Sequence, residues 1–519
     1  MKVLLAGYNL DSEVIDALVK NSPPRLDITP ETLSAAYARI SRDPRPVHEL
    51  RAEARKEVER ARRSNQTIIF KMGHHSVAEH AVFNFDIIGV SRLAIEAIEH
   101  FRLASYTEKS QRYVKLGGEV VVPEEIREAG REKEFLALTR KQHELYQSLY
   151  ERLRPYFFER FRPYASDPRN QVILDNWAKE DARYVLSLST QSQLGMTVNA
   201  RTLELMIRRF AGARLAELRT LGKRLYELAS EVAPSLLLFT EASPYEVSTY
   251  DDLLTASRPI IEKKIKLEKI KKGAKSRKTR LEAVRVINLT PGGDDYLLAV
   301  MLHRILPLSF EDCQRITRKL KPEEKKKLFL TSFRRLEFYD RLLREFEHAE
   351  LAFELIVSAS CFAQLKRHRL ATLTCQPYDP ALGVTVPPSV RAIGASKAFL
   401  AIMKEAENLY EQLKPAGTDV ASYALTNAHR RRVLFKANVR ELYHISRLRQ
   451  DQSAQWDIRN VVGEMIKLAR QALPLAFLLA GGKDAFPELY SRLFGQEPQM
   501  KPPPLLRPVP ESKEEKKFL

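Results

Sequence analysis

The chain has few cysteines and no long hydrophobic run. Its 519 residues include three cysteines, Cys313, Cys361 and Cys375, and no two of them stand in a CxxC spacing. A zinc site or a disulfide framework is therefore not expected, and this cysteine usage favours a reducing cytoplasm. No stretch approaches the ~20 apolar residues of a membrane span. The apolar run near the N-terminus is too short for a signal peptide, so we expect a soluble cytoplasmic protein.

Acidic residues are fewer than basic residues. The chain carries 85 Lys and Arg against 66 Asp and Glu, for a net charge of +19, and such an excess attracts phosphate groups. Part of the excess is local, because residues 263–280 hold ten basic residues and one Glu. No aromatic residue is interleaved there for base stacking. We interpret this segment as a solvated connector, with nucleic-acid binding as the less favoured alternative. A Gly-x-Gly-x-x-Gly nucleotide motif is also absent.

The chain is rich in internal repetition. Residues 80–112 and 348–379 share an order of Glu-His, an aromatic-rich strand, an apolar helix, a basic tip and Leu-Ala-Ser/Thr. His80 and Arg102 are 22 positions apart, and His348 and Arg369 are 21 apart. A second pair of matching segments follows at 198–219 and 437–459. Two ordered matches at nearly constant spacing indicate an internal duplication, and the length suits two domains.

We therefore predict an α+β protein of two tandem domains, each a mixed sheet flanked by a helical bundle. The domains are expected at 1–245 and 283–490, with a basic connector at 246–282 and a Pro-rich disordered tail at 491–519. The expected strands lie at 3–6, 83–88, 284–289 and 351–357, and Ser91 is expected to cap the helix after the second of them. The expected helices include 125–160, 181–188, 197–210, 395–414 and 437–449.

Three groups of polar residues are candidates for ligand binding. Arg367, His368 and Arg369 follow an apolar helix and can grip a phosphate or the oxygen-rich rim of a flavin. Near Glu108, Ser110 and Arg112 suit an oxyanion held by a loop. One predicted helix carries the third group, in which Arg440 and His444 form an i, i+4 pair: Asn438, Arg440, His444 and Arg449. Taken singly, each group also fits a solvated helix end, a surface loop or an amphipathic helix.

Taken jointly, these segments resemble the flavin-dependent thymidylate synthase (ThyX) family. Its signature is Arg-His-Arg, seven residues and Ser, continued as Ser-x-Arg-Tyr. Gly-His-x-Ser-x-x-Glu-His stands upstream, and Asn-x-Arg and Ala-Gln-x-Glu-Ile-Arg stand downstream. The matching segments are Gly73–His80, Leu103–Tyr113, Arg367–Ala371 and Ser453–Arg459. The resemblance covers roughly 1–245 and 283–490, so the chain is similar to two such domains in tandem.

The two copies depart from the pattern in complementary places. In the first copy Arg-His-Arg is replaced by His100-Phe101-Arg102, and the helix Gln is Ala97. The second copy keeps the triplet and Gln364 but has Pro377–Pro380 instead of Ser-x-Arg-Tyr. An Arg that the family places before Asn-x-Arg is present as Arg183 and replaced by Ser422. The uracil-activating Arg is Arg449, where the first copy has Phe210 beside Arg209.

The resemblance implies composite sites that combine the two copies. The implied substrate-binding residues are Glu108, Ser110, Gln111, Arg112, Arg183, Gln364 and Arg367, with Arg449 as the catalytic residue. The implied FAD-binding residues are His74, Ser76, Arg367, His368, Arg369, Asn438, Arg440 and His444. No metal is implied. The tandem chain would act as a covalent dimer, and a homodimer would form a pseudo-tetramer.

The implied reaction is the reductive methylation of dUMP to dTMP, with methylenetetrahydrofolate and NADPH as co-substrates and FAD as the redox cofactor. None of the three cysteines stands in the Pro-Cys-His setting of the unrelated cysteine-dependent enzyme. Two other interpretations remain open. One is a catalytically impaired paralogue that binds flavin or nucleotide, and the other is an RNA-binding or uridine-modifying protein that uses the basic connector.

Overall fold

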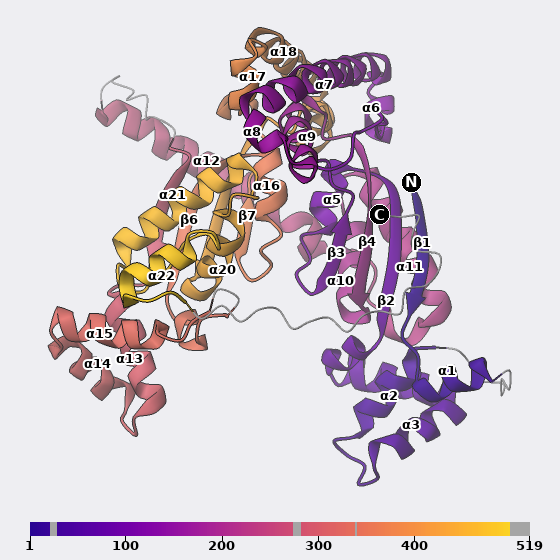
Figure 1. Ribbon diagram of the computed structural model, residues 1–519. Helices are drawn as coiled ribbons and strands as arrows, with labels where there is room; N and C mark the ends of the chain where they lie inside the picture. Colours follow the sequence, from indigo (N-terminus) through magenta and orange to yellow (C-terminus); the bar gives the residue numbers. More distant parts are fainter. Residues whose placement is uncertain (21–28, 273–281, 338–339, 499–519) are drawn as a thin grey trace. The chain divides into compact units, whose positions relative to one another are not determined.

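Two four-stranded sheets with the same strand order form the centres of the protein (Figure 1). The computed structural model describes residues 1–20, 29–272, 282–337 and 340–498. The first sheet has the order β1 (Lys2–Tyr8), β2 (Val82–Ser91), β4 (Gln191–Asn199) and β3 (Ala104–Glu108). The second has the order β5 (Val284–Leu289), β6 (Glu350–Ser358), β8 (Arg430–Asn438) and β7 (Thr372–Cys375). The identical orders agree with the duplication predicted from the sequence.

The prediction of mixed sheets is wrong in the first sheet. Its three strand pairs, β1 with β2, β2 with β4 and β3 with β4, are all antiparallel, and β5 pairs with β6 in the same way. One face of β2 is buried through Phe83, Phe85 and Ile87, whereas Asn84 and Asp86 are exposed. An antiparallel sheet permits this half-buried alternation, because only one of its faces needs to be covered. The coarser prediction of an α+β chain holds.

The strands β3, β4, β7 and β8 were not predicted from the sequence. In β4, Leu194, Met196 and Val198 point inward at a period of two, between exposed Gln193, Gly195 and Thr197. The predicted helix at 181–188 is wrong, because α9 (Pro168–Ala182) ends there in the short 3-10 helix η3 (Arg183–Val185). The predicted helix at 197–210 begins later, as α10 (Ala200–Ala211), where Asn199 Oδ1 accepts a hydrogen bond from the Thr202 amide at 2.8 Å.

Matching helix caps establish the residue equivalence between the repeats. Ser91 Oγ accepts a hydrogen bond from the Ala94 amide at 2.9 Å and starts α5 (Arg92–Ile98), as the sequence predicted. Ser358 Oγ does the same for Cys361 at 3.0 Å and starts α16 (Ala359–Leu365). Farther along the chain, η3 corresponds to η8 (Ser422–Ala424), and the cap Asn199 corresponds to Asn438.

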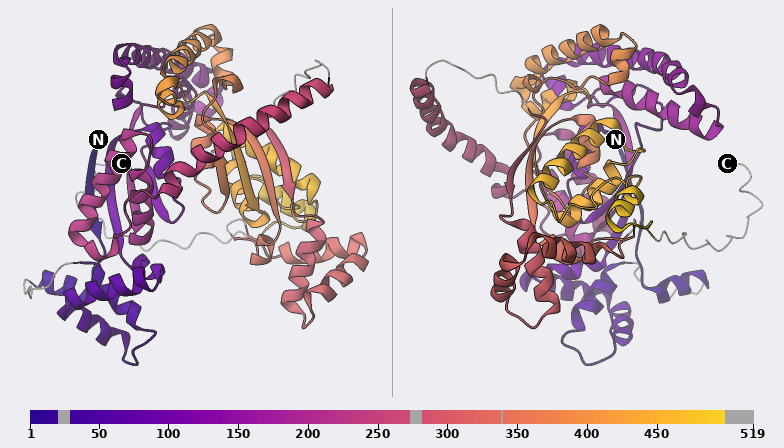
Figure 2. Two further views of the ribbon diagram at one scale, coloured as in Figure 1. Left: turned by 180° about the vertical axis from the view of Figure 1, so that it is seen from behind. Right: turned by 60° about the vertical axis from the view of Figure 1, so that its left-hand side comes forward.

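The compact units of the structure have different boundaries from the sequence repeats. The first unit contains 1–282, 356–369 and 375–432, and the second contains 283–355, 370–374 and the chain from 433 onward. The first unit therefore joins the whole first repeat to α16 and to α18 (Ser396–Leu413) of the second. In it, α7 (Glu132–Arg160), α9 and α18 pack together in one helical bundle (Figure 2).

A local two-fold relation joins the two repeats inside the first unit. Ser187 and Thr426, which occupy equivalent positions, form an antiparallel bridge with each other. The Leu188 amide donates to Leu425 O at 2.8 Å, and the equivalent Asn427 amide donates to Leu186 O at 2.9 Å. Each repeat thus makes the bond that the other makes in return, which is the signature of an isologous contact.

The same turn contains a buried histidine, His429, which is expected to make the free energy of unfolding depend on pH. His429 is fully buried, its Nδ1 accepts a hydrogen bond from the Thr426 amide at 3.0 Å, and burial lowers its pKa to about 3. The neutral ring favours folding above the ordinary pKa of 6.5, and this contribution is lost as the pH falls below that value, by at most about 1.4 kcal/mol per pH unit. His429→Asn, which keeps an acceptor but does not titrate, is expected to flatten the stability profile between pH 6.5 and 4. Denaturant unfolding at several pH values measures this, and unchanged steepness in the variant would contradict it.

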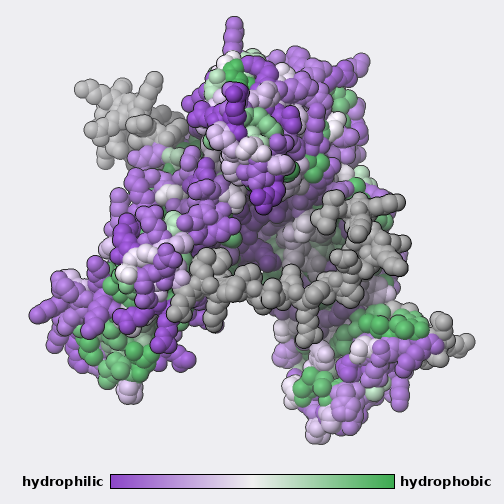
Figure 3. Space-filling view, viewed as in Figure 1, coloured by the Kyte–Doolittle hydropathy of each residue, from purple (hydrophilic) through white to green (hydrophobic). Residues whose placement is uncertain are grey.

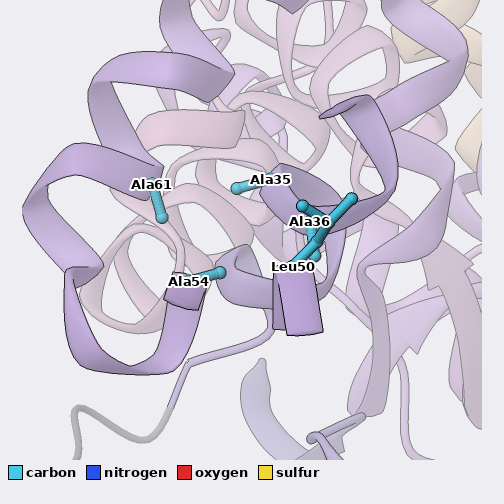
Figure 4. Close-up of a cluster of buried hydrophobic side chains, with 5 residues drawn as sticks. All are labelled: Ala35, Ala36, Leu50, Ala54 and Ala61. Carbon is cyan, nitrogen blue, oxygen red and sulfur yellow. The ribbon is translucent and has the colours of Figure 1, made fainter. Parts of the chain in front are cut away.

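Small helical layers accompany each sheet. In the first unit α2 (Glu31–Arg39), α3 (Val47–Lys56) and α4 (Val58–Asn65) meet around a buried cluster of four alanines and Leu50 (Figure 4). Beside them, α1 (Ser12–Val19) exposes Ile15, Leu18 and Val19, seen as a hydrophobic patch in Figure 3. In the second unit the corresponding place in the chain holds α13 (Gly293–Ile305), α14 (Phe310–Lys319) and α15 (Pro322–Phe333).

One of the remaining helices, α12 (Pro244–Lys272), contains residues 246–272 of the predicted connector. The remaining helices are α6 (Glu124–Glu128), α8 (Arg162–Ala165), α11 (Ala216–Val232), α12, α17 (Pro388–Ala392), α19 (Thr418–Ala421), α20 (Val439–Arg449), α21 (Trp456–Ala472) and α22 (Phe486–Phe494). The basic run therefore starts on a helix, and its part from 273 to 280 lies outside the described residues. Of the tail predicted at 491–519, residues 491–494 belong to α22, and the part from 499 onward lies outside the described residues. Among the helices described, none is long and apolar enough to cross a membrane.

Candidate functional site

A buried polar cluster in the first unit combines residues of both repeats. Gln111 and Arg112 follow β3, Arg183 follows α9, and Asn427 lies in the turn after η8. Asn427 Nδ2 donates to Gln111 Oε1 at 3.1 Å and to Arg183 O at 3.0 Å. Arg112 forms an ion pair with the buried Glu180, and its amide donates to Ser110 Oγ at 3.1 Å. The cluster therefore places two guanidinium groups beside two amide side chains.

Several polar atoms of this cluster have no hydrogen-bond partner in the part of the chain that the structure describes. Arg183 is 5% exposed, and its buried Nε and Nη2 make no hydrogen bond. The same holds for Gln111 Nε2 and Asn427 Oδ1. Burial lowers the pKa of Arg183, although Tyr184 and Glu180 oppose this effect. Because unpaired buried polar atoms are costly, such a group of donors and one acceptor fits a ligand with an anionic part and polar edges.

The predicted Arg-His-Arg triplet lies against the first repeat. Arg367 Nη2 is 2.7 Å from Glu108 Oε2 and 3.2 Å from Glu99 Oε1. Arg369 Nη1 donates to the backbone carbonyls of Arg102 and Ala104. His368 is buried, whereas the Arg367 side chain is 37% exposed. Arg367 thus remains within reach of solvent, while Arg369 joins the turn after α16 to the start of β3.

The place related to the cluster by the local two-fold is filled with protein. Tyr378 stands at the position of Gln111, and its hydroxyl donates to Glu96 Oε1 at 2.9 Å. Arg431 Nη1 is 3.1 Å from Glu96 Oε2, and its guanidinium lies 4.5 Å from the centre of the Tyr378 ring. Both Tyr378 and Glu96 are buried. This second place has a phenol, an ion pair and a stacked Arg where the first has unpaired amide and guanidinium atoms.

The other predicted residues of the first unit lie in two settings. His74 and Ser76 are exposed beside Gly73, which has a φ of +77°. They precede and begin the short helix η2 (His75–His80). Gln364 is buried on α16, and its Nε2 donates to Ser360 O at 3.4 Å. The structure thus joins Gln111 to Arg183 through Asn427, pairs Arg112 with Glu180, and pairs Glu108 with Arg367.

Four predicted residues belong to the second unit, on α20. Asn438 Oδ1 caps this helix by accepting from the Glu441 amide at 2.8 Å. Arg440 donates to Leu342 O at 2.7 Å and pairs with Glu347 at 2.8 Å. His444 is exposed, and burial of part of its ring together with nearby arginines lowers its pKa. Arg449 is the last residue of the helix.

The Arg440 contact repeats a pair in the first unit, where Arg201 lies 2.6 Å from Glu79. In both repeats the Glu of Glu-His therefore binds the Arg of Asn-x-Arg. This pairing gives the two motifs a structural role beside the one predicted from the resemblance.

Sequence analysis missed Asn427 and Glu180. Asn427 replaces Leu188 of the first repeat in a fully buried turn, and a polar residue at a position where the other copy is apolar was the available signal. Glu180 precedes Arg183 by one helical turn, so its pairing with Arg112 could not be read from spacing alone. Both residues belong to the cluster because the fold brings their segments together.

A profile of the family described as thymidylate synthase complementing protein matches residues 26–235 and 285–475. The chain belongs to this family. The two matched regions correspond to the two repeats, as the resemblance predicted. The two matches together span most of the sequence, which agrees with tandem domains of the family.

Relatives of two kinds are similar to this family member. A UPF0159 protein of Thermoplasma acidophilum is 26% identical over 78% of the chain and 86% of its own length. A UPF0159 protein of Chlamydia muridarum is 25% identical over 78% of both chains. A flavin-dependent thymidylate synthase of Geobacter sulfurreducens is 31% identical over 34% of the chain and 67% of its own length. The first kind shares the tandem length, and the second matches a part of it.

Proposed function

We propose that the chain is a flavin-dependent thymidylate synthase-like enzyme that methylates dUMP reductively to dTMP. Methylenetetrahydrofolate and NADPH would be its co-substrates. The observation that carries this proposal is the buried cluster of Gln111, Arg183 and Asn427, whose side chains have unpaired polar atoms beside Arg112. Three of these four residues stand where the resemblance expects substrate contacts. The relatives named flavin-dependent thymidylate synthase support the same reaction.

In this proposal the first unit binds the nucleotide. Ser110, Arg112 and Arg183 would hold the phosphate and sugar, since paired guanidinium groups suit a phosphate dianion. Gln111, Gln364 and Arg367 would contact the base or sugar, with Glu108 fixing Arg367 through their ion pair. Arg449 would stabilise negative charge that develops on the uracil ring. The second place, filled by Tyr378, Glu96 and Arg431, would hold no nucleotide.

FAD, when bound, would supply the electron transfer between NADPH and the methylene group. The exposed donors fit such an oxygen-rich cofactor, because His74 and Ser76 follow Gly73, which has open space around it, and Arg367 is partly exposed. His368 of the first unit, and Asn438 and His444 of the second unit, would be further FAD-binding residues. Arg369 and Arg440 already bind protein groups, so their proposed part is to hold the neighbouring segments in place. Two chains would associate, and four repeats would form a pseudo-tetramer.

The decisive test is to purify the protein, record its visible spectrum and assay dTMP formation. We expect bound flavin with absorbance near that of oxidised FAD, and dTMP that appears only when dUMP, methylenetetrahydrofolate and NADPH are all supplied. Flavin without any dTMP would select the impaired, flavin-binding paralogue, which the filled second place favours as the next candidate. Neither flavin nor dTMP would reject the proposal.

A further inference from the structure

We propose that buried charges make the two repeats complementary partners that pair with each other and reject a second copy of themselves. The key contact is between Glu99 of the first repeat and Lys366 of the second, with Lys366 Nζ 2.8 Å from Glu99 Oε2. Their side chains are 3% and 5% exposed. This inference concerns how the repeats recognise each other and does not depend on the proposed reaction.

Glu99 and Lys366 are equivalent residues. Aligning the caps Ser91 and Ser358 places Glu99 at the position of Lys366, one residue after each helix. Because the two equivalent residues touch each other, this position lies on the local two-fold relation of the repeats. A pair of identical repeats in the same arrangement would set Glu99 against Glu99, or Lys366 against Lys366. Like charges buried at such a distance repel strongly, so opposite charges are required.

The neighbouring ion pairs, whose carboxylates are buried, have the same polarity. Arg367 pairs with Glu99 and Glu108, and Arg431 pairs with Glu96 at 3.1 Å. In each of these contacts the carboxylate comes from the first repeat and the cation from the second. The equivalent positions do not carry the opposite set: the second repeat has Ala363 and Cys375 where the first has Glu96 and Glu108, and the first has His100 and Ser192 where the second has Arg367 and Arg431.

Self-pairing would therefore fail on both sides. Two first repeats would bring Glu96, Glu99 and Glu108 together with their own copies. They would lose the cations of the second repeat and keep Arg92, 3.6 Å from Glu96, as a cation of their own. Two second repeats would gather Lys366, Arg367 and Arg431 without an acid. Specificity between partners commonly depends on such repulsive alternatives as well as on attraction. The arrangement also determines that Arg367 of the second repeat pairs with Glu108 of the first repeat, because the first repeat has His100 at the position equivalent to Arg367.

The test uses full-length charge reversals. Lys366→Glu and Glu99→Lys are each expected to lower the midpoint of thermal unfolding by roughly 5–10 °C, because each sets like charges together in a buried place. The double variant, which exchanges the two charges, is expected to recover more than half of the loss. The matched control exchanges Lys141 and Glu405, an exposed pair between the repeats at 2.7 Å, and is expected to change the midpoint by no more than about 1 °C.

Partner choice is tested by producing the two single variants together with different affinity tags. A chain with Lys366→Glu cannot pair its own repeats well, but its first repeat matches the second repeat of a Glu99→Lys chain, and the reverse holds too. We expect the two variants to copurify and to regain stability through this exchange. A double variant no more stable than the weaker single one, or single variants as stable as the unmodified chain, would overturn the proposal.

Discussion

Replacing Arg183 with methionine is expected to stabilise the ligand-free protein and to weaken dUMP binding at least about 100-fold. Arg183 is buried with Nε and Nη2 unpaired, and burial lowers its pKa, so the empty protein bears the cost of a desolvated cation. Methionine fills a similar volume without that cost, which is typically about 1–3 kcal/mol for unpaired buried polar groups. The bound phosphate would lose the partner that the guanidinium supplies.

Thermal unfolding without ligand and calorimetric titration with dUMP measure the two effects separately. The control is Arg169→Met on the preceding helix α9, because the Arg169 side chain is 89% exposed and pairs locally with Asp167. This control is expected to change neither stability nor binding. A variant of Arg183 that loses stability and retains dUMP affinity would show that the side chain serves the fold, and the nucleotide site would have to be placed elsewhere.

Local patterns allowed the sequence to predict the elements that carry much of the site. The alternation in Phe83–Ile88 and the cap Ser91 are set by neighbouring residues, and both are found as expected. β4 was missed because Gly195 and several polar residues interrupt its apolar alternation, and its central place in the sheet overrides the weak local preference. The predicted mixture of parallel and antiparallel strands was also wrong in the first sheet, because the direction of strand pairing depends on how distant segments meet.

The contacts between the repeats could also be predicted only in part from the sequence. Complementary losses in the motifs predicted that residues of both copies would combine, and Arg367 does pair with Glu108. Spacing could not reveal that Tyr378 would occupy the position of Gln111 and bind Glu96, or that Asn427 would join Gln111. Each of these contacts links segments about 280 or more residues apart in the chain. Only the fold brings them together, although the differences between equivalent residues were visible in the sequence.

Arg449→Ala is expected to lower kcat for dTMP formation by about 100- to 1000-fold while leaving dUMP binding nearly unchanged. The reason is that a cation which meets charge developing on the uracil acts mainly in the transition state. Arg112→Ala is expected to inactivate by the other route, through a large rise in KM, because the phosphate is present in the ground state as well. Steady-state kinetics with varied dUMP distinguish the two variants.

Arg209→Ala provides the matched control, because Arg209 lies beside Phe210 in the last turn of the equivalent helix of the first repeat. Its guanidinium lies 5.7 Å from the centre of the Phe101 ring and 3.6 Å from Glu246, so it already has protein partners. We expect its kcat to stay within about twofold of the unmodified enzyme, as for surface changes outside the reacting centre. If Arg209→Ala abolished activity and Arg449→Ala did not, the first repeat would supply the activating cation.

If Arg112→Ala and Arg449→Ala chains regained activity when mixed, the two residues of one site would come from different chains. Inactivity of the mixture would assign both to the same chain.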